Sequence, residues 1–146
     1  MTLYFYGTVT DYETVWNGSG GTDHGNWFTD HASLGEGHTT VAASALPTAT
    51  DDIVVLTSIY DLGSARTVNT AVFYGELGGE PPLTCTNGAV FNDSSYNNGA
   101  IGGDATFNDS SGNNSGTVQG DATFNDGSYN SGTVQGDATF NDGSYN

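Results

Sequence analysis

A short unit repeated in tandem dominates the C-terminal half of the chain. The unit Ala-Thr-Phe-Asn-Asp begins at Ala105, Ala122 and Ala138, and a variant with Val in second place begins at Ala89. The phenylalanines of these units are spaced by 16, 17 and 16 residues. Helical repeat units need about 34 residues and propeller blades about 40, so this period is typical of one coil of a β-solenoid.

The apolar residues within one period predict a coil with three short faces. Tyr129 lies five residues after Phe124, and Val134 five residues after Tyr129. Each is preceded two positions earlier by Ala or Gly, and residues two apart share one face of a strand. We therefore expect the small and the large residue to point inward and the intervening Thr or Ser outward. Asn and Asp tolerate a left-handed backbone, so we expect them at the corners.

Coils stacked about 4.8 Å apart would place like residues on one another and build internal ladders. The expected core ladders are Phe91, Phe107, Phe124 and Phe140; Tyr96, Tyr129 and Tyr145, with Gly112 in the same column; and Ile101, Val118 and Val134. A single coil has no neighbour to stack on, so stability should grow with coil number. The sequence stops at Asn146, partway round a coil, and we expect a longer protein or a partner to continue the stack.

Composition favours strands and excludes most helix. The chain contains 22 glycines and only 35% hydrophobic residues, and each glycine costs a helix about 1 kcal/mol. We predict an all-β fold: a right- or left-handed β-solenoid with about 16 residues per three-faced coil, preceded by an irregular β-rich capping region. The cap and first strands should occupy 1–80, a Pro-containing junction 81–86, and about four coils, the last incomplete, 87–146. The junction is placed there because two prolines do not fit a central strand.

The charge balance excludes several classes of partner. Thirteen Asp and four Glu stand against Arg66 alone, which gives a formal net charge of −16. This charge excludes binding to the phosphate backbone of a nucleic acid. No apolar stretch approaches transmembrane length, and the N-terminus lacks the basic and apolar segments of a secretory signal. We expect an extracellular or virion location, reached by another route such as lysis.

The repeats resemble the pentapeptide-repeat solenoids, whose sides carry a small inward residue followed two places later by a large apolar one. The steps that carry this resemblance include Ala122-Thr-Phe and Gly132-Thr-Val, and it covers the chain from Ala89 to Tyr145. The coil of about 16 residues, its three faces and its Phe, Tyr and Val ladders depart from that family.

The N-terminal half looks like the opening segment of repetitive β-solenoid proteins from phages and environmental bacteria. The resemblance lies in Trp16-Asn17-Gly18, in Asn26-Trp27 and in the stretch from Leu46 to Val55, where a Pro precedes two Asp and a strand. It implies a cap that begins a parallel β-helix and displays it on a virion or cell surface. Trp16 and Trp27 are then expected to cover the first coil, with sugar stacking as the alternative.

Candidate metal ligands occur in two places. His24, His31 and His38 recur every seven residues in a Gly-rich stretch, where we expect ordinary loop histidines with a divalent metal as the alternative. Asp104, Asp121 and Asp137 should stack in one column, and Asp93, Asp109, Asp126 and Asp142 in a second. We expect these carboxylates to cap corners and no cofactor to bind, with bridging calcium as the alternative.

Nothing in the sequence gathers the unlike groups that catalysis requires, since the acids recur identically and Arg66 is the single strong cation. We expect a non-enzymatic structural or adhesive fibre protein, a virion appendage or extracellular filament component. Its expected partners are further copies, virion or filament subunits, and host-surface glycans. The alternatives are a bacterial surface adhesin fragment and a calcium- or glycan-binding solenoid module. Ice-binding and DNA-mimic solenoids are more remote.

Overall fold

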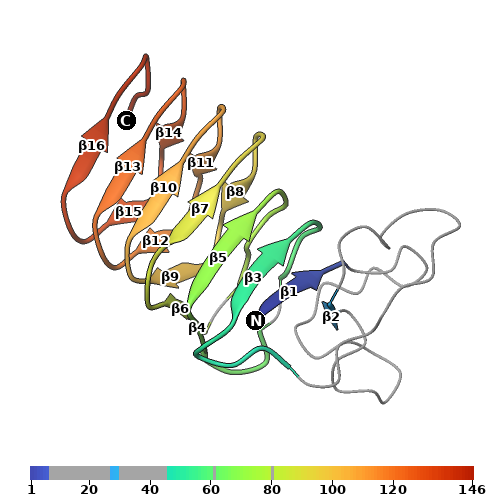
Figure 1. Cartoon of the computed structure of the whole chain (residues 1–146). Helices are drawn as coiled ribbons and strands as arrows, with labels where there is room; N and C mark the ends of the chain where they lie inside the picture. Colours follow the sequence, from blue (N-terminus) through green and yellow to red (C-terminus); the bar gives the residue numbers. More distant parts are fainter. Residues whose placement is uncertain (7–26, 30–45, 61, 80) are drawn as a thin grey trace, which may run out of the picture.

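The computed structural model describes residues 1–6, 27–29, 46–60, 62–79 and 81–146 of the chain. These residues form a β-solenoid with no helix among them, in which successive coils stack along one axis (Figure 1). The predicted all-β solenoid class is thus confirmed. Trp16 and the three histidines at 24, 31 and 38 lie outside the described residues.

Three sheets form the faces of the solenoid. The longest, here called the Phe sheet, contains eight strands in the order β16-β13-β10-β7-β5-β3-β1-β2, all parallel except for the antiparallel pair of β1 and β2. Its strands are β1 (Thr2–Phe5), β2 (Trp27–Phe28), β3 (Asp52–Val55), β5 (Thr70–Phe73), β7 (Ala89–Phe91), β10 (Ala105–Phe107), β13 (Ala122–Phe124) and β16 (Ala138–Phe140).

The other two faces are shorter. The Asn sheet consists of β8 (Tyr96–Asn97), β11 (Gly112–Asn113) and β14 (Tyr129–Asn130). The Val sheet consists of β4 (Arg66–Val68), β6 (Leu83–Cys85), β9 (Ala100–Gly102), β12 (Thr117–Val118) and β15 (Thr133–Val134). Each of the three complete repeats therefore passes once through each sheet, as the three-face pattern predicts.

The phenylalanine ladder forms the centre of the core. In register, Phe73, Phe91, Phe107, Phe124 and Phe140 follow one another up the Phe sheet. Their rings are stacked nearly parallel, with centroids 4.5 to 4.9 Å apart. Phe91, Phe107 and Phe124 are fully buried, and Phe140 is partly buried against the same core. The second predicted ladder, Ile101, Val118 and Val134, is also in register in the Val sheet, with its first two members fully buried.

The parallel stack begins well before Asn87. Strands β1, β3 and β5 continue the Phe sheet, with Leu3, Ile53 and Ala71 buried in the column that later holds the repeat alanines. The coils here are longer than in the repeats, since Thr70 and Asn87 bond to partners 18 residues away. Their length and varied residues hide them from a search for a 16-residue repeat.

The proposed junction at 81–86 does not interrupt this stack. Strand β6 lies within it and pairs with β4 on one side and β9 on the other. Pro81 and Pro82 precede the strand, where a missing N–H breaks no ladder bond, and the Pro82 carbonyl still accepts a hydrogen bond from the backbone N–H of Arg66. The prolines therefore start a strand and do not separate two sheets.

The tyrosine column corrects one sequence-based prediction. Tyr96, Gly112, Tyr129 and Tyr145 are aligned as expected. However, Tyr96 is 37% exposed and Tyr145 60% exposed, so the prediction that they point inward is wrong. Gly127 lies in a turn with a positive φ of 75°, and the strand begins only after it. The alternation of inward and outward side chains therefore starts at Ser128, which is fully buried, and Tyr129 after it points outward.

Candidate functional site: the outer faces of the solenoid

Buried asparagines support the Asn sheet from inside, and sequence reasoning missed them. The Asn97 amide donates to Asn113 at 2.9 Å, Asn113 donates to Asn130 at 2.9 Å, and Asn130 donates to Asn146 at 2.7 Å. Asn97 and Asn113 are fully buried. Two apolar residues, Ile59 and Leu77, occupy the same column in the preceding coils. The sequence does contain an indication of this asparagine ladder, since an Asn follows the tyrosine position in every repeat.

The outer surface of the Phe sheet carries hydroxyl and amide groups at the repeat period. Thr106, Thr123 and Thr139 are in register and lie between inward-pointing Ala and Phe. At the adjoining corner a second amide ladder links Asn92, Asn108, Asn125 and Asn141 through side-chain hydrogen bonds of 3.0 to 3.1 Å. These bonds hold each amide in a fixed orientation, so that the corner presents the same polar group in every coil.

The tyrosine column forms an aromatic ridge on the outside of the Asn sheet. The rings of Tyr129 and Tyr145 are stacked at 5.9 Å, while Tyr96 and Tyr129 are 6.3 Å apart and tilted. The ring of Tyr129 leans over Gly112, where an added Cβ would collide with it. Partial burial raises the pKa of the Tyr129 hydroxyl. The glycine that interrupts the column therefore makes room for the neighbouring ring.

The aspartates of the first column act as caps between coils. The Asp104 carboxylate accepts the backbone N–H of Asp121 at 2.9 Å, and the Asp121 carboxylate accepts the N–H of Asp137 at 2.8 Å. These contacts match the expected corner capping. Within the described part of the chain, no group of three or more His, Cys, Asp or Glu is arranged to hold a metal ion.

A second column of aspartates occupies the corner after the Phe sheet. Asp93, Asp109, Asp126 and Asp142 are exposed and have positive φ angles of 50° to 54°. A left-handed backbone is accessible to Asp at low cost, so their conformation follows from the turn.

A polar hollow of about 470 Å³ lies where the Val sheet turns into the Phe sheet. Thr86, Asn87, Asp104 and Thr106 contribute its polar groups, and Gly88, Gly103, Ala89 and Val90 complete its lining. It contains one carboxylate and one amide among hydroxyl groups, which suits contact with a polar surface and offers no pair of unlike catalytic groups.

Three side chains in the N-terminal coils, Asp51, Asp52 and Cys85, have shifted pKa values that follow from their structural roles. Asp52 accepts hydrogen bonds from the Thr70 hydroxyl at 2.6 Å and the Asn69 amide at 2.7 Å, which lower the pKa of its carboxyl group. Hydrogen bonds from the Thr48 hydroxyl and N–H lower the pKa of Asp51, which also lies 3.1 Å from the N-terminal ammonium group. Burial raises the pKa of the Cys85 thiol to about 12, so this thiol is inert as a nucleophile.

Trp27, expected to cap the first coil, is fully buried against Phe5, with the two rings edge to face at 5.1 Å. The described residues contain no helix long and apolar enough to cross a membrane. Comparisons with protein-family models, with curated proteins and with solved structures found no significant match. The fold alone therefore gives the class, a β-solenoid repeat protein.

Proposed function

We propose that this protein is a non-enzymatic structural or adhesive fibre component, part of a virion appendage or of an extracellular surface filament. The observation that carries the proposal is the repetition of the same outward groups at the same register. Thr106, Thr123 and Thr139 recur on one face, and the amide ladder that includes Asn108 and Asn125 recurs beside them. A catalytic site needs unlike groups that converge on one point, whereas a periodic surface suits repeated, multivalent contacts.

The energetics of the stack support a fibre role. Each buried phenylalanine contacts the ring below and the ring above, so every added coil buries apolar area on both sides. The asparagine ladder adds side-chain hydrogen bonds along the same axis. Such a stack is stiff along its length and can hold surface groups at a fixed spacing, which is the mechanical requirement of a fibre.

The acidic surface supports a location outside the cell, among partners that are neither nucleic acids nor anionic membranes. The formal net charge of −16 keeps separate fibres apart in solution. The partners in this proposal are subunits of the same filament or virion, and uncharged host-surface glycans.

The proposal is tested by locating the chain in its source material. An antibody against the chain, with gold labelling in electron microscopy, should mark virions or surface filaments in the unfractionated culture. The same antibody preabsorbed with the purified protein is the control. Label confined to soluble monomers, with calcium or ice binding by those monomers, would contradict a fibre role.

A further inference from the structure

The outer face of the Phe sheet changes character at its N-terminal end. In the repeats its outward column holds threonine, but at the same register the earlier strands hold Tyr4, Val54, Val72 and Val90. The next outward column holds Tyr6, Leu56 and Tyr74 and continues with asparagines. Apolar side chains thus gather on the outer surface of β1, β3 and β5, where the repeat pattern would place polar ones.

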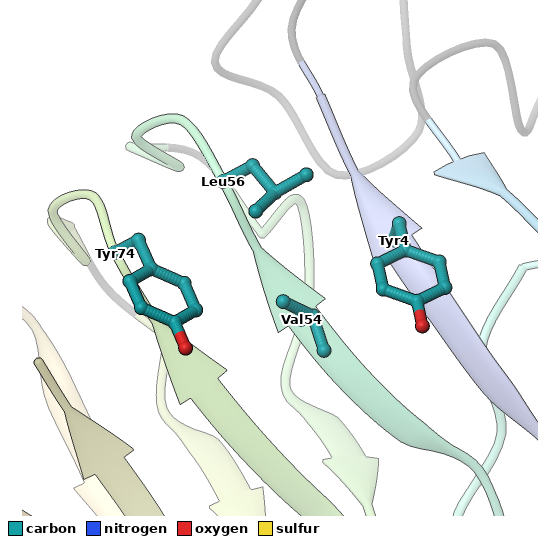
Figure 2. Close-up of a pocket in the computed structure, with 4 residues that line it drawn as sticks. All are labelled: Tyr4, Val54, Leu56 and Tyr74. Carbon is teal, nitrogen blue, oxygen red and sulfur yellow. The ribbon is translucent and has the colours of Figure 1, made fainter. Parts of the chain in front are cut away.

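Among the described residues, Tyr4, Val54, Leu56 and Tyr74 line an open groove of about 450 Å³, here called the Tyr4–Tyr74 groove (Figure 2). Figure 2 shows the two tyrosine rings on either side of the aliphatic residues, with both hydroxyl groups directed to the same side. Tyr74 is 44% exposed. The groove therefore combines an aliphatic floor, two aromatic rings and two phenol hydroxyl groups.

The separation of the rings indicates an extended ligand. Strand β3 lies between β1, which carries Tyr4, and β5, which Tyr74 follows, so the backbones at Tyr4 and Tyr74 are about 9.6 Å apart across the sheet, at about 4.8 Å per strand. Tyr74 also lies two residues beyond the register partner of Tyr4, which adds an offset of about 6.6 Å along the strand direction. A single flat ring held between two others needs only about 7 to 8 Å. The groove is too wide to clamp one ring, and suits a chain of ring-shaped units that contacts both tyrosines.

Two observations decide between the chemical classes of ligand. First, none of the described residues that line the groove is charged, and Asp52, the carboxylate two residues before Val54 on β3, is engaged by Thr70 and Asn69. The net charge of −16 disfavours an anionic ligand. Second, β3 is paired on both sides, with β1 and with β5, so no strand edge is open to an extended peptide in this groove.

We infer that the Tyr4–Tyr74 groove binds a neutral oligosaccharide, whose apolar ring faces contact the tyrosines and the aliphatic floor while its hydroxyl groups bond to the exposed phenol of Tyr74. This inference deepens the adhesive role proposed above and rests on it. It assigns glycan contact to the N-terminal coils, at one defined groove, and leaves the polar faces of the repeats for contacts between subunits.

The experiment titrates the full chain with neutral hexasaccharides of glucose, N-acetylglucosamine and mannose, and with polygalacturonate as the anionic probe. Calorimetry gives the affinity, and the tyrosine ring signals in NMR report the site. We expect at least one neutral hexasaccharide to bind and polygalacturonate not to bind. Tyr74→Ala should weaken binding about tenfold or more through the loss of one aromatic contact. Tyr74→Phe should retain most of the affinity.

Tyr145→Ala is the matched control, because Tyr145 is also an exposed tyrosine but follows β16, the last strand of the stack. It should leave the affinity unchanged.

Val54→Thr tests the floor without removing a ring, and should weaken binding while the circular dichroism spectrum stays that of the parent. Absence of binding by all three neutral probes, equal loss in Tyr74→Ala and Tyr145→Ala, or tighter binding of polygalacturonate would each overturn the inference. Concentration-dependent dimerisation abolished by Tyr74→Ala would overturn it in favour of a second copy. Gold labelling of filaments tests the fibre role independently of these results.

Discussion

At one corner of the solenoid, the conformational strain of the backbone differs between coils. The turn after each of the four repeat strands β7, β10, β13 and β16 has two consecutive residues with positive φ: Asp93 and Ser94 in one coil, Asp109 and Ser110 in the next. In later coils the second position is Gly127 or Gly143. A serine in the left-handed region is disfavoured by about 1 to 2 kcal/mol, whereas glycine adopts it freely. The two serine-containing corners are therefore strained relative to the two glycine-containing ones.

This comparison predicts that Ser110→Gly stabilises the protein by about 0.5 to 1 kcal/mol, the relief of strain being partly offset by the greater freedom of glycine in the unfolded chain. The reciprocal change, Gly127→Ser, should destabilise it by a similar amount. An added Cβ at Gly127 would lie 3.8 Å from its nearest neighbour, so only the backbone opposes the change. Urea unfolding followed by circular dichroism measures both. Destabilisation by Ser110→Gly would show that the serine side chain matters more than its φ.

At the scale of the strands, burial alternates sharply along each segment of the Phe sheet. In β13, Ala122 and Phe124 are buried and Thr123 is partly exposed. Phe124 stacks on Phe107 at 4.8 Å and on Phe140 at 4.9 Å. Removal of its ring would leave a gap in the middle of a continuous ladder, with two apolar faces that no longer contact a partner.

Phe124→Ala should therefore lower the free energy of unfolding by about 3 to 5 kcal/mol, the range for a buried phenylalanine whose cavity cannot collapse. Thr123→Ala, one residue away on the same strand, should cost less than about 1 kcal/mol because it loses only strand propensity. Denaturant unfolding monitored by tyrosine fluorescence compares the two variants. Similar losses at both positions would mean that the threonine face is itself buried in an interface.

The same alternation explains how far the strands could be predicted from sequence. The repeat phenylalanines mark each coil at a spacing of 16 or 17 residues, which is enough to predict the sheet order, the register and two of the three core ladders. The prediction that Tyr129 points inward is wrong because a two-residue turn, Asp126 and Gly127, precedes this strand. The alternation of inward and outward side chains restarts after a turn. The sequence predicts a cap and first strands in 1–80, but it does not show that the segment around Ile53 already belongs to the stacked coils, because their 18-residue spacing and varied side chains show no repeat.

The functional surfaces were less accessible to sequence reasoning than the core. The Tyr4–Tyr74 groove joins residues from β1, β3 and the end of β5, and only the strand register brings them together. The sequence predicts the Asp104 column, but it does not predict the hydrogen bonds from these carboxylates to the backbone of the next coil. A repeat therefore predicts what each coil places inward, whereas a site formed across several non-identical coils becomes visible only in the assembled stack.

For the molecule as a whole, electrostatic repulsion opposes the stacking that builds it. The net charge is −16, and the exposed aspartates at 93, 109, 126 and 142 occupy equivalent corners of successive coils. With coils about 4.8 Å apart, each neighbouring pair of carboxylates repels by roughly 1 kcal/mol or less in water. The screening length falls from about 30 Å at 0.01 M salt to about 8 Å at 0.15 M. Repulsion summed over the whole acidic surface is therefore strongest at low ionic strength.

It follows that the melting temperature should rise as NaCl is increased from about 0.01 to 0.15 M, and that choline chloride should have the same effect because screening is independent of the cation. The double variant Asp109→Asn and Asp126→Asn should be more stable than the parent at low salt and should show a smaller salt dependence. Asparagine also tolerates the left-handed backbone at these corners, so the substitution changes charge without changing the turn. Scanning calorimetry over the salt series measures the slope. If the melting temperature depends on salt as strongly in the double variant as in the parent, the dominant repulsion lies elsewhere. If CaCl₂ alone raises the melting temperature at equal ionic strength, these columns bind calcium.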